Sequence, residues 1–196
     1  GTDLYPAHVG RAVAAPLLDI TAIAGLRGIR RDDRGWAIGA TTTWTDVVRA
    51  ELPPLFAALK AAAREVGGVQ IQNTGTVAGN LCNASPAADG TPALLAMRAR
   101  VVLQSARGLR ELAVDEFVLG NRRTARADDE LVVAVRIPTW SERARSGAAA
   151  CIARGGPPLW RVADVHGPSR PYFRDISSSS TRFARTYSYP DERVNA

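Results

Sequence analysis

The chain has 196 residues, 46% of them apolar, so one domain or two small ones with a hydrophobic core are expected. No run nears the roughly 20 consecutive apolar residues that cross a bilayer, so no membrane span is expected. Two cysteines, Cys82 and Cys151, and two histidines are too few for a disulfide scaffold, an iron–sulfur cluster or a metal site of the usual kinds. The net charge of +6 is carried almost wholly by arginine, but no interleaved aromatic platform or recognition-helix pattern accompanies it, so no nucleic-acid binding is expected.

The first forty residues predict a strand and a hairpin. Residues 1–4, Gly-Thr-Asp-Leu, show neither the basic segment nor the apolar run of a secretory signal, so a cytoplasmic location is expected. Residues 17–20, Leu-Leu-Asp-Ile, form a short apolar run that predicts a strand. Residues 28–31 and 36–40 flank the turn-forming cluster Asp-Asp-Arg-Gly at 32–35, which predicts a hairpin.

Three helices are expected in the middle of the chain. Thr43 and Asp46 have the Thr-x-x-acid spacing of a capping box, which predicts the start of a helix. A longer helix is predicted over residues 55–66, where apolar residues recur at helical spacing before a glycine pair. A short helix is predicted after Thr91 as its N-cap, with Pro92 at its first position.

Strands are expected again towards residue 138, after which the pattern changes. Residues 100–104 and 109–114 flank a turn and predict paired strands, and residues 130–137, Glu-Leu-Val-Val-Ala-Val-Arg-Ile, predict a strand that a proline ends. Residues 139–196 have no sustained periodicity and contain a run of four serines and scattered arginines. This composition predicts an irregular tail, either disordered or translated out of frame.

One segment has the composition of a ligand-binding loop. Residues 75–89 are mostly small, hydroxyl and amide residues between two predicted helices, so a loop there would let a ligand approach the backbone. Its amides would suit a pyrophosphate. Residues 1–4 are a second, glycine-led segment of this kind. The alternative is that both are tight structural turns, and the Gly-x-Gly-x-x-Gly and P-loop motifs are absent from the sequence.

Residues 76–80, Thr-Val-Ala-Gly-Asn, are followed nine residues later by Asp89. This pattern resembles the Thr-Ile-Gly-Gly-Asn…Asp signature of the FAD-binding subunits of molybdenum hydroxylases, the family of xanthine dehydrogenases, aldehyde oxidoreductases and carbon monoxide dehydrogenases. Residues 1–4 look like the end of that family's Gly-Gly-Thr-Asp-Leu motif, with its first glycine missing. The resemblance covers residues 1–138.

The resemblance implies an α+β, two-subdomain FAD-binding fold of the molybdopterin dehydrogenase type, incomplete at its N-terminus. The first subdomain would span about 1–25 and the second about 26–138, with the irregular tail at 139–196. The family's strands ahead of the first motif are not in the sequence, and residues 140–196 do not resemble its C-terminal domain.

The resemblance also implies roles for individual residues. The first segment would hold the FAD diphosphate, and the second would clamp it with backbone amides, the Asn80 amide fixing the loop. Asp89 would accept a hydrogen bond from a ribose hydroxyl, and Leu131 or Val132 would pack near the flavin rings. The implied contacts are Gly1, Thr2, Asp3, Leu4, Thr76, Ala78, Gly79, Asn80, Asp89, Leu131 and Val132.

One of these residues departs from the family's pattern, and Asp89 and several nearby residues have plainer interpretations. Ala78 replaces the usual glycine, which is tolerated only if its φ is negative. Asp89 could instead cap the following helix. Cys82 is expected to be a small buried hydrophobe, and Trp36 and Trp44 are expected to lie in the core.

By resemblance, the chain would be an oxidoreductase subunit that is active only in a complex. A molybdenum-cofactor subunit would hydroxylate the substrate, a second subunit would carry [2Fe–2S] clusters, and FAD on this chain would pass the electrons to NAD or another acceptor. The first alternative is a truncated, FAD-free remnant that acts as a non-catalytic interaction protein. The second is a free-standing FAD reductase, which is less favoured because no substrate pocket is suggested.

Overall fold

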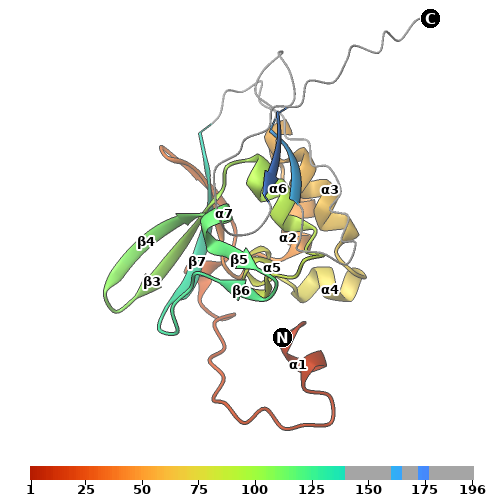
Figure 1. The fold of residues 1–196 in the computed structure, drawn as a ribbon, viewed down its shortest axis with the longest axis vertical. Helices are drawn as coiled ribbons and strands as arrows, with labels where there is room; N and C mark the ends of the chain where they lie inside the picture. Colours follow the sequence, from red (N-terminus) through yellow and green to blue (C-terminus); the bar gives the residue numbers. More distant parts are fainter. Residues whose placement is uncertain (140–159, 165–171, 177–196) are drawn as a thin grey trace, which may run out of the picture.

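The computed structural model describes residues 1–139, 160–164 and 172–176 (Figure 1). Its centre is a five-stranded sheet in the order β1-β2-β7-β3-β4, with every neighbouring pair antiparallel. The strands are β1 (Ile29–Asp32), β2 (Gly35–Gly39), β3 (Arg100–Ser105), β4 (Gly108–Ala113) and β7 (Leu131–Pro138). The strand predicted at 130–137 therefore lies at the centre of the sheet, as β7, and joins its two hairpins.

Both predicted hairpins are confirmed. The turn between β1 and β2 falls on residues 32–35, where Asp32 pairs with Gly35. Gly35 has φ +122°, and a Cβ there would lie 2.2 Å from the Ile137 carbonyl oxygen of β7. Glycine is therefore required twice, for its backbone conformation and for the close approach of two strands.

The helices gather on one side of the sheet (Figure 1). They are α2 (Trp44–Arg49), the 3-10 turn η2 (Pro54–Phe56), α3 (Ala57–Glu65), α4 (Val69–Thr74), α5 (Val77–Asn83), α6 (Gly90–Ala96) and α7 (Val114–Phe117). The predicted capping box of α2 is confirmed in both directions. The Asp46 amide donates to Thr43 Oγ1 at 3.1 Å, and the Thr43 amide donates to Asp46 Oδ2 at 2.9 Å.

The core lies between this helical layer and the inner face of the sheet. It contains the fully buried side chains of Trp44, Phe56, Leu59 and Phe117, together with those of the central strands. Trp36 is half-buried and meets Phe56 edge-on, with the ring centroids 5.3 Å apart. The expected core position of Trp44 is thus confirmed, and Trp36 packs at the margin of the same core.

Residues 1–28 extend from this body and form little regular structure beyond α1 (Leu4–Ala7) and the 3-10 turn η1 (Ala24–Leu26) (Figure 1). The predicted strand at 17–20 is wrong: no strand forms there, and Leu17 and Leu18 are 55% and 85% exposed. An apolar run becomes a strand only when a neighbouring strand takes its hydrogen bonds. The edge strand β1 pairs with β2 alone among the described residues.

Two further predictions near the helices need correction. Helix α6 begins at Gly90 rather than after Thr91, so Asp89 occupies the N-cap position and Thr91 lies buried inside the helix. Residues 77–83, expected within a loop, form α5. In both places small residues on one face pack into the core, and that burial extends the helix beyond its capping signals.

The remaining described elements are a small pair of strands beside α7 and a second pair late in the chain. The first pair is β5 (Val118–Gly120) with β6 (Arg123–Thr124). The second is β8 (Trp160–Asp164) with β9 (Tyr172–Ile176), and β8 lies beside α6. The rest of the predicted irregular tail, 140–159, 165–171 and 177–196, lies outside the described residues.

Candidate functional site

The segment predicted to clamp a ligand is built around α5. Thr76 has an extended backbone ahead of the helix, and its hydroxyl accepts a hydrogen bond from the Gly79 amide at 2.9 Å. Val77, Ala78 and Leu81 are buried on the inner face, whereas Gly79 is exposed on the outer one. The chain therefore folds here because a threonine caps the turn and an apolar stripe packs inward.

Ala78, which departs from the family's glycine, is accommodated without strain. It lies inside α5 and is not among the described non-glycine residues with positive φ, which are Ala84, Arg98 and Arg122. Its methyl group is 4% exposed and belongs to the core cluster. The condition on which alanine is tolerated at this position is met.

Gly79 leaves the backbone bare at the outer surface of α5. A Cβ at this position would lie 2.8 Å from Thr76 Oγ1, the oxygen that caps the helix. Any side chain would therefore displace the cap. Glycine both preserves the cap and lets a ligand approach the main chain.

Asn80 carries an unsatisfied buried oxygen. Its Oδ1 has no hydrogen-bond partner among the described residues. A Cβ on Gly90, the first residue of α6, would come within 3.2 Å of that oxygen, so Asn80 faces the start of α6 beside Asp89. A buried acceptor without a donor is costly, and a hydroxyl or N–H group from a ligand would satisfy it.

Asp89 is exposed and holds the N-cap position of α6, but its side chain accepts no capping hydrogen bond. The alternative interpretation as a helix-capping acid therefore lacks its hydrogen bond. Partial burial, with a smaller contribution from the Glu65 charge, raises the pKa of the Asp89 carboxyl above its ordinary value. Its oxygens remain available to an external hydroxyl donor.

The first predicted segment reaches the same helix through Asp3. Asn83, the last residue of α5, donates from Nδ2 to Asp3 Oδ1 at 2.7 Å, across 80 positions of sequence. The Oδ1 atom of Asn83 accepts a hydrogen bond from the Arg122 guanidinium, in the turn between β5 and β6. Within the same segment, the Tyr5 amide donates to the Gly1 carbonyl at 3.1 Å.

Sequence reasoning missed Asn83, which joins the two predicted segments, and Arg122, which bonds to Asn83. Nothing in the sequence distinguishes Asn83 from the other polar residues of 75–89, or Arg122 from the many other arginines. Gly120 and Asn121 were the only local signal, because such a pair marks a tight turn that projects the next side chain.

The residues predicted to lie near the flavin rings occupy the start of β7, which contacts α5. Val132 is 3% exposed and faces the core, whereas Leu131 is half-buried. Only Leu131 of the two offers surface to a ligand in this conformation. Cys82 is exposed on α5, so its expected burial is wrong; neighbouring atoms still desolvate the thiol and raise its pKa, against an opposing effect of the Arg126 charge.

Together these residues present groups of the kinds that contact ribose hydroxyls and a diphosphate. The segments offer a bare backbone at Gly79, an unpaired oxygen on Asn80, a carboxylate on Asp89 and a cation at Arg122. Among the described residues, no group of three or more His, Cys, Asp or Glu side chains could hold a metal ion. No helix in the described part of the chain is long and apolar enough to cross a membrane.

An α+β domain with two small-residue segments joined at one short helix has the architecture of a nucleotide-cofactor-binding domain. Comparison with known families makes the class specific. The chain belongs to the family described as FAD binding domain in molybdopterin dehydrogenase, whose profile matches residues 1–140. The resemblance in the sequence and the expected α+β fold class are both confirmed.

Individual relatives agree with this assignment. The carbon monoxide dehydrogenase medium chain of Hydrogenophaga pseudoflava is 33% identical over 131 residues, 64% of this chain and 44% of that one. The xanthine dehydrogenase FAD-binding subunit of Escherichia coli O157:H7 is 34% identical over 141 residues, 70% of this chain and 48% of that one. The chain thus spans somewhat less than half the length of these relatives.

A solved structure of the H. pseudoflava carbon monoxide dehydrogenase, lacking the molybdenum-pyranopterin moiety of its cofactor, has the same fold. It superimposes with a TM-score of 0.67 at 30% identity, over 82% of this chain and 56% of that one. Quinoline 2-oxidoreductase from Pseudomonas putida 86 shares the fold with a TM-score of 0.63 at 23% identity.

Proposed function

We propose that this chain binds FAD and serves as the electron-transferring flavin subunit of a molybdenum-containing hydroxylase or dehydrogenase complex. The observation that carries the proposal is the junction at α5, where the two segments that resemble the family's motifs meet through Asp3 and Asn83. A shared ligand needs such a junction, because both segments must touch it at once.

When bound, FAD would accept electrons from iron–sulfur clusters and deliver them to NAD or another acceptor. The chain's own work is to bind and orient the cofactor. Thr76 and Gly79 present main-chain groups, Asn80 and Asp89 offer oxygens to hydroxyl donors, and Leu131 supplies apolar surface beside α5. No general base on this chain is required for that role.

The partners follow from the same proposal. A molybdenum-cofactor subunit and a [2Fe–2S] subunit would supply the groups that this chain does not carry, and the complex would work in the cytoplasm as a xanthine dehydrogenase-like oxidoreductase. The substrate would be set by the molybdenum subunit. We further propose the division into subdomains at about residue 25, since residues 1–28 contribute no buried side chain to the body.

The proposal is tested by titrating the purified chain with FAD and recording the visible flavin absorbance that stays with the protein through gel filtration. Retained flavin is the expected result. Asn80→Ala and Asp89→Asn should each weaken binding by about 1–3 kcal/mol, because each removes one polar contact to the cofactor.

Asp33→Asn is the matched control, since Asp33 is exposed in the β1–β2 turn on another element. A chain that never retains FAD would favour the alternative function, a flavin-free interaction protein. Retention with equal affinity in all three variants would leave FAD binding standing but contradict the site assigned to it.

A further inference from the structure

Arg122 occupies a conformation that its residue type disfavours. Its φ is +56°, the left-handed region in which a side chain is strained and glycine is preferred. The turn holds it there, because the Arg122 amide donates to the Ala84 carbonyl at 2.9 Å, at the left-handed end of α5. The strain makes the contacts of the Arg122 side chain a feature to explain.

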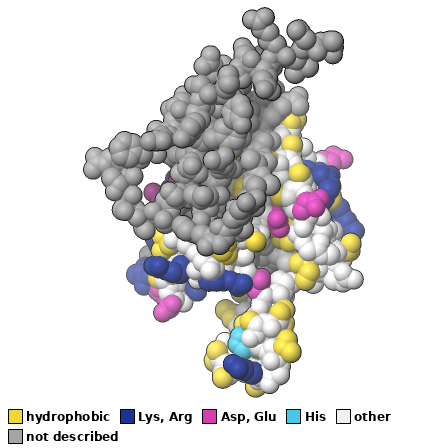
Figure 2. Space-filling view, turned by 45° about the vertical axis from the view of Figure 1, so that its right-hand side comes forward, with side chains coloured by type: hydrophobic (Ala, Val, Ile, Leu, Met, Phe, Trp, Pro, Cys, Tyr) yellow, Lys and Arg dark blue, Asp and Glu magenta, His cyan; other side chains and the backbone are white. Residues whose placement is uncertain are grey.

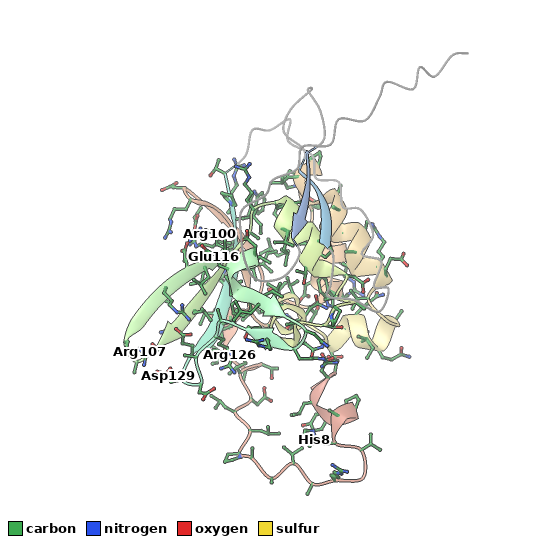
Figure 3. All side chains as sticks on the ribbon, viewed as in Figure 1. His8, Arg100, Arg107, Glu116, Arg126 and Asp129 are labelled. Carbon is green, nitrogen blue, oxygen red and sulfur yellow. The ribbon has the colours of Figure 1, made fainter. Side chains whose placement is uncertain are left out.

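The Arg122 side chain is directed back to α5 and binds an amide instead of a carboxylate. Among the described residues it has no ion-pair partner, although at least six other arginines do. Those pairs are Arg27–Asp46, Arg34–Glu111, Arg100–Glu111, Arg107–Asp129, Arg110–Glu130 and Arg136–Asp32. Figure 3 shows one of them, Arg107 beside Asp129 at the end of the sheet.

The side-chain amide of Asn83 is oriented by a charged group at each end. Asn83 Nδ2 points to the Asp3 carboxylate and Oδ1 to the Arg122 guanidinium. The carboxylate is thereby held one amide away from the guanidinium instead of neutralising it directly. An exposed arginine in this state keeps its remaining N–H donors and its charge for an anion.

We propose that Arg122 binds the diphosphate of FAD and that Asn83 positions its guanidinium for this contact. The inference rests on the proposed FAD binding and goes beyond it, because it adds a cation from the β5–β6 turn to the two segments that the family motifs define. A diphosphate is an anion that two guanidinium N–H groups can bind together.

The first experiment measures FAD affinity by flavin fluorescence for the full chain, Arg122→Gln, Arg122→Lys and Arg123→Gln. Arg122→Gln retains a donor for Asn83 but lacks charge, and it should bind FAD about ten- to hundredfold more weakly. Arg122→Lys should recover part of the loss. Arg123→Gln is the control, because it removes the same charge from the neighbouring position on β6. No side-chain contact of Arg123 is found among the described residues. This variant should bind FAD with an affinity within about twofold of the parent chain's.

A second variant separates binding from folding. Arg122→Gly relieves the backbone strain, so it should raise the melting temperature by about 2–4 °C while weakening FAD binding as much as Arg122→Gln does. A purely structural arginine would instead move stability and affinity in the same direction.

The dependence of FAD affinity on salt concentration tests the Arg122 contact independently. Affinity of the parent chain should fall more steeply with ionic strength than that of Arg122→Gln, because one charge contact has been removed. Equal affinity of Arg122→Gln and Arg123→Gln would overturn the inference while leaving FAD binding intact. Absence of FAD binding by the parent chain would overturn the proposed function and this inference together.

Discussion

The body of the molecule and its N-terminal segment, residues 1–28, contain the same kinds of apolar residue, but the body buries them and the segment exposes them. Leu59 and Leu81 in the body are fully buried, whereas Leu17 and Leu18 in the segment are mostly exposed, and no residue in 1–28 is buried. In the space-filling view the segment protrudes with hydrophobic side chains on its surface (Figure 2). Burial thus depends on a facing layer, which the helices provide for the sheet and nothing described provides for residues 1–20.

Polar contacts take the place of packing in attaching the segment. The Arg27 guanidinium meets the Asp46 carboxylate at 3.1 Å, and the Gly28 amide donates to Thr42 Oγ1 at 3.0 Å. Near the N-terminus the attachment is the Asp3–Asn83 bond. The two proposed FAD-binding segments therefore differ in support, one resting on the core and the other on hydrogen bonds.

The largest contrast between the two regions should come from large-to-small substitutions. Trp44→Ala empties a fully buried site in the body and should lower the free energy of unfolding by about 3–5 kcal/mol. Tyr5→Ala in the segment, where Tyr5 is 63% exposed, should leave it nearly unchanged. Urea unfolding measures both variants. It is followed by far-UV circular dichroism, because Trp44→Ala alters the tryptophan fluorescence. Equal losses of stability would contradict the contrast between the body and the N-terminal segment.

Acid should act on the body through Glu130. Its side chain is 5% exposed and binds the Arg110 guanidinium, and these contacts lower its pKa to about 2. A lowered pKa stabilises the fold above the ordinary value of 4.5, and that contribution is lost as the pH falls towards about 2. Glu130→Gln should therefore lower the free energy of unfolding at neutral pH.

The measurement is the unfolding free energy of Glu130→Gln and of the parent chain from neutral pH down to about 2. The difference between them should shrink as the pH falls. Glu51→Gln, an exposed residue without an ion-pair partner among the described residues, is the control and should track the parent chain. A difference that stays constant with pH would show that the Glu130 charge does not contribute.

A smaller effect is expected from paired threonine and aspartate residues that occur in both regions. Thr43→Ala removes the reciprocal cap of α2 and should cost about 0.5–2 kcal/mol. Thr21→Ala removes a similar local bond to Asp19 in the segment, where both groups are exposed, and should cost less than about 0.5 kcal/mol. Thermal unfolding of the two variants compares a part-buried threonine contact with an exposed one, and similar losses would mean that exposure does not set their size.

The smallest effect is expected from Leu18→Ser. Leu18 is 85% exposed, so stability should change by no more than about 0.5 kcal/mol in either direction. Leu81→Ser, at a fully buried position of α5, is the contrast and should unfold the chain at much lower denaturant. Strong destabilisation by Leu18→Ser would show that the segment packs against the body in solution.

Most elements with complete local signals were predictable. The Asp-Asp-Arg-Gly turn gave the β1–β2 hairpin, and the Thr43–Asp46 spacing gave the start of α2. The predictions at 17–20, at Thr91 and at 77–83 were wrong because their local signals were incomplete. Each outcome depended on whether another part of the chain lay alongside, either to accept hydrogen bonds or to bury a face.

The candidate site divides in the same way. Thr76, Gly79 and Asn80 were predicted from a contiguous motif, and the structure adds the cap at Thr76 and the unpaired oxygen of Asn80. Asn83 and Arg122 could not be predicted, because their roles depend on contacts across 80 and 39 positions.

By itself the sequence determined the family, the α+β class, the hairpins and the capped start of α2, since each depends on residues that are close in the chain. Only the tertiary structure decided that α5 is a helix, that the N-terminal segment meets it through Asp3 and Asn83, and that Arg122 is held in a strained conformation beside them. The physical reason is that burial and charge pairing act between segments, and local propensity does not encode which segments will meet.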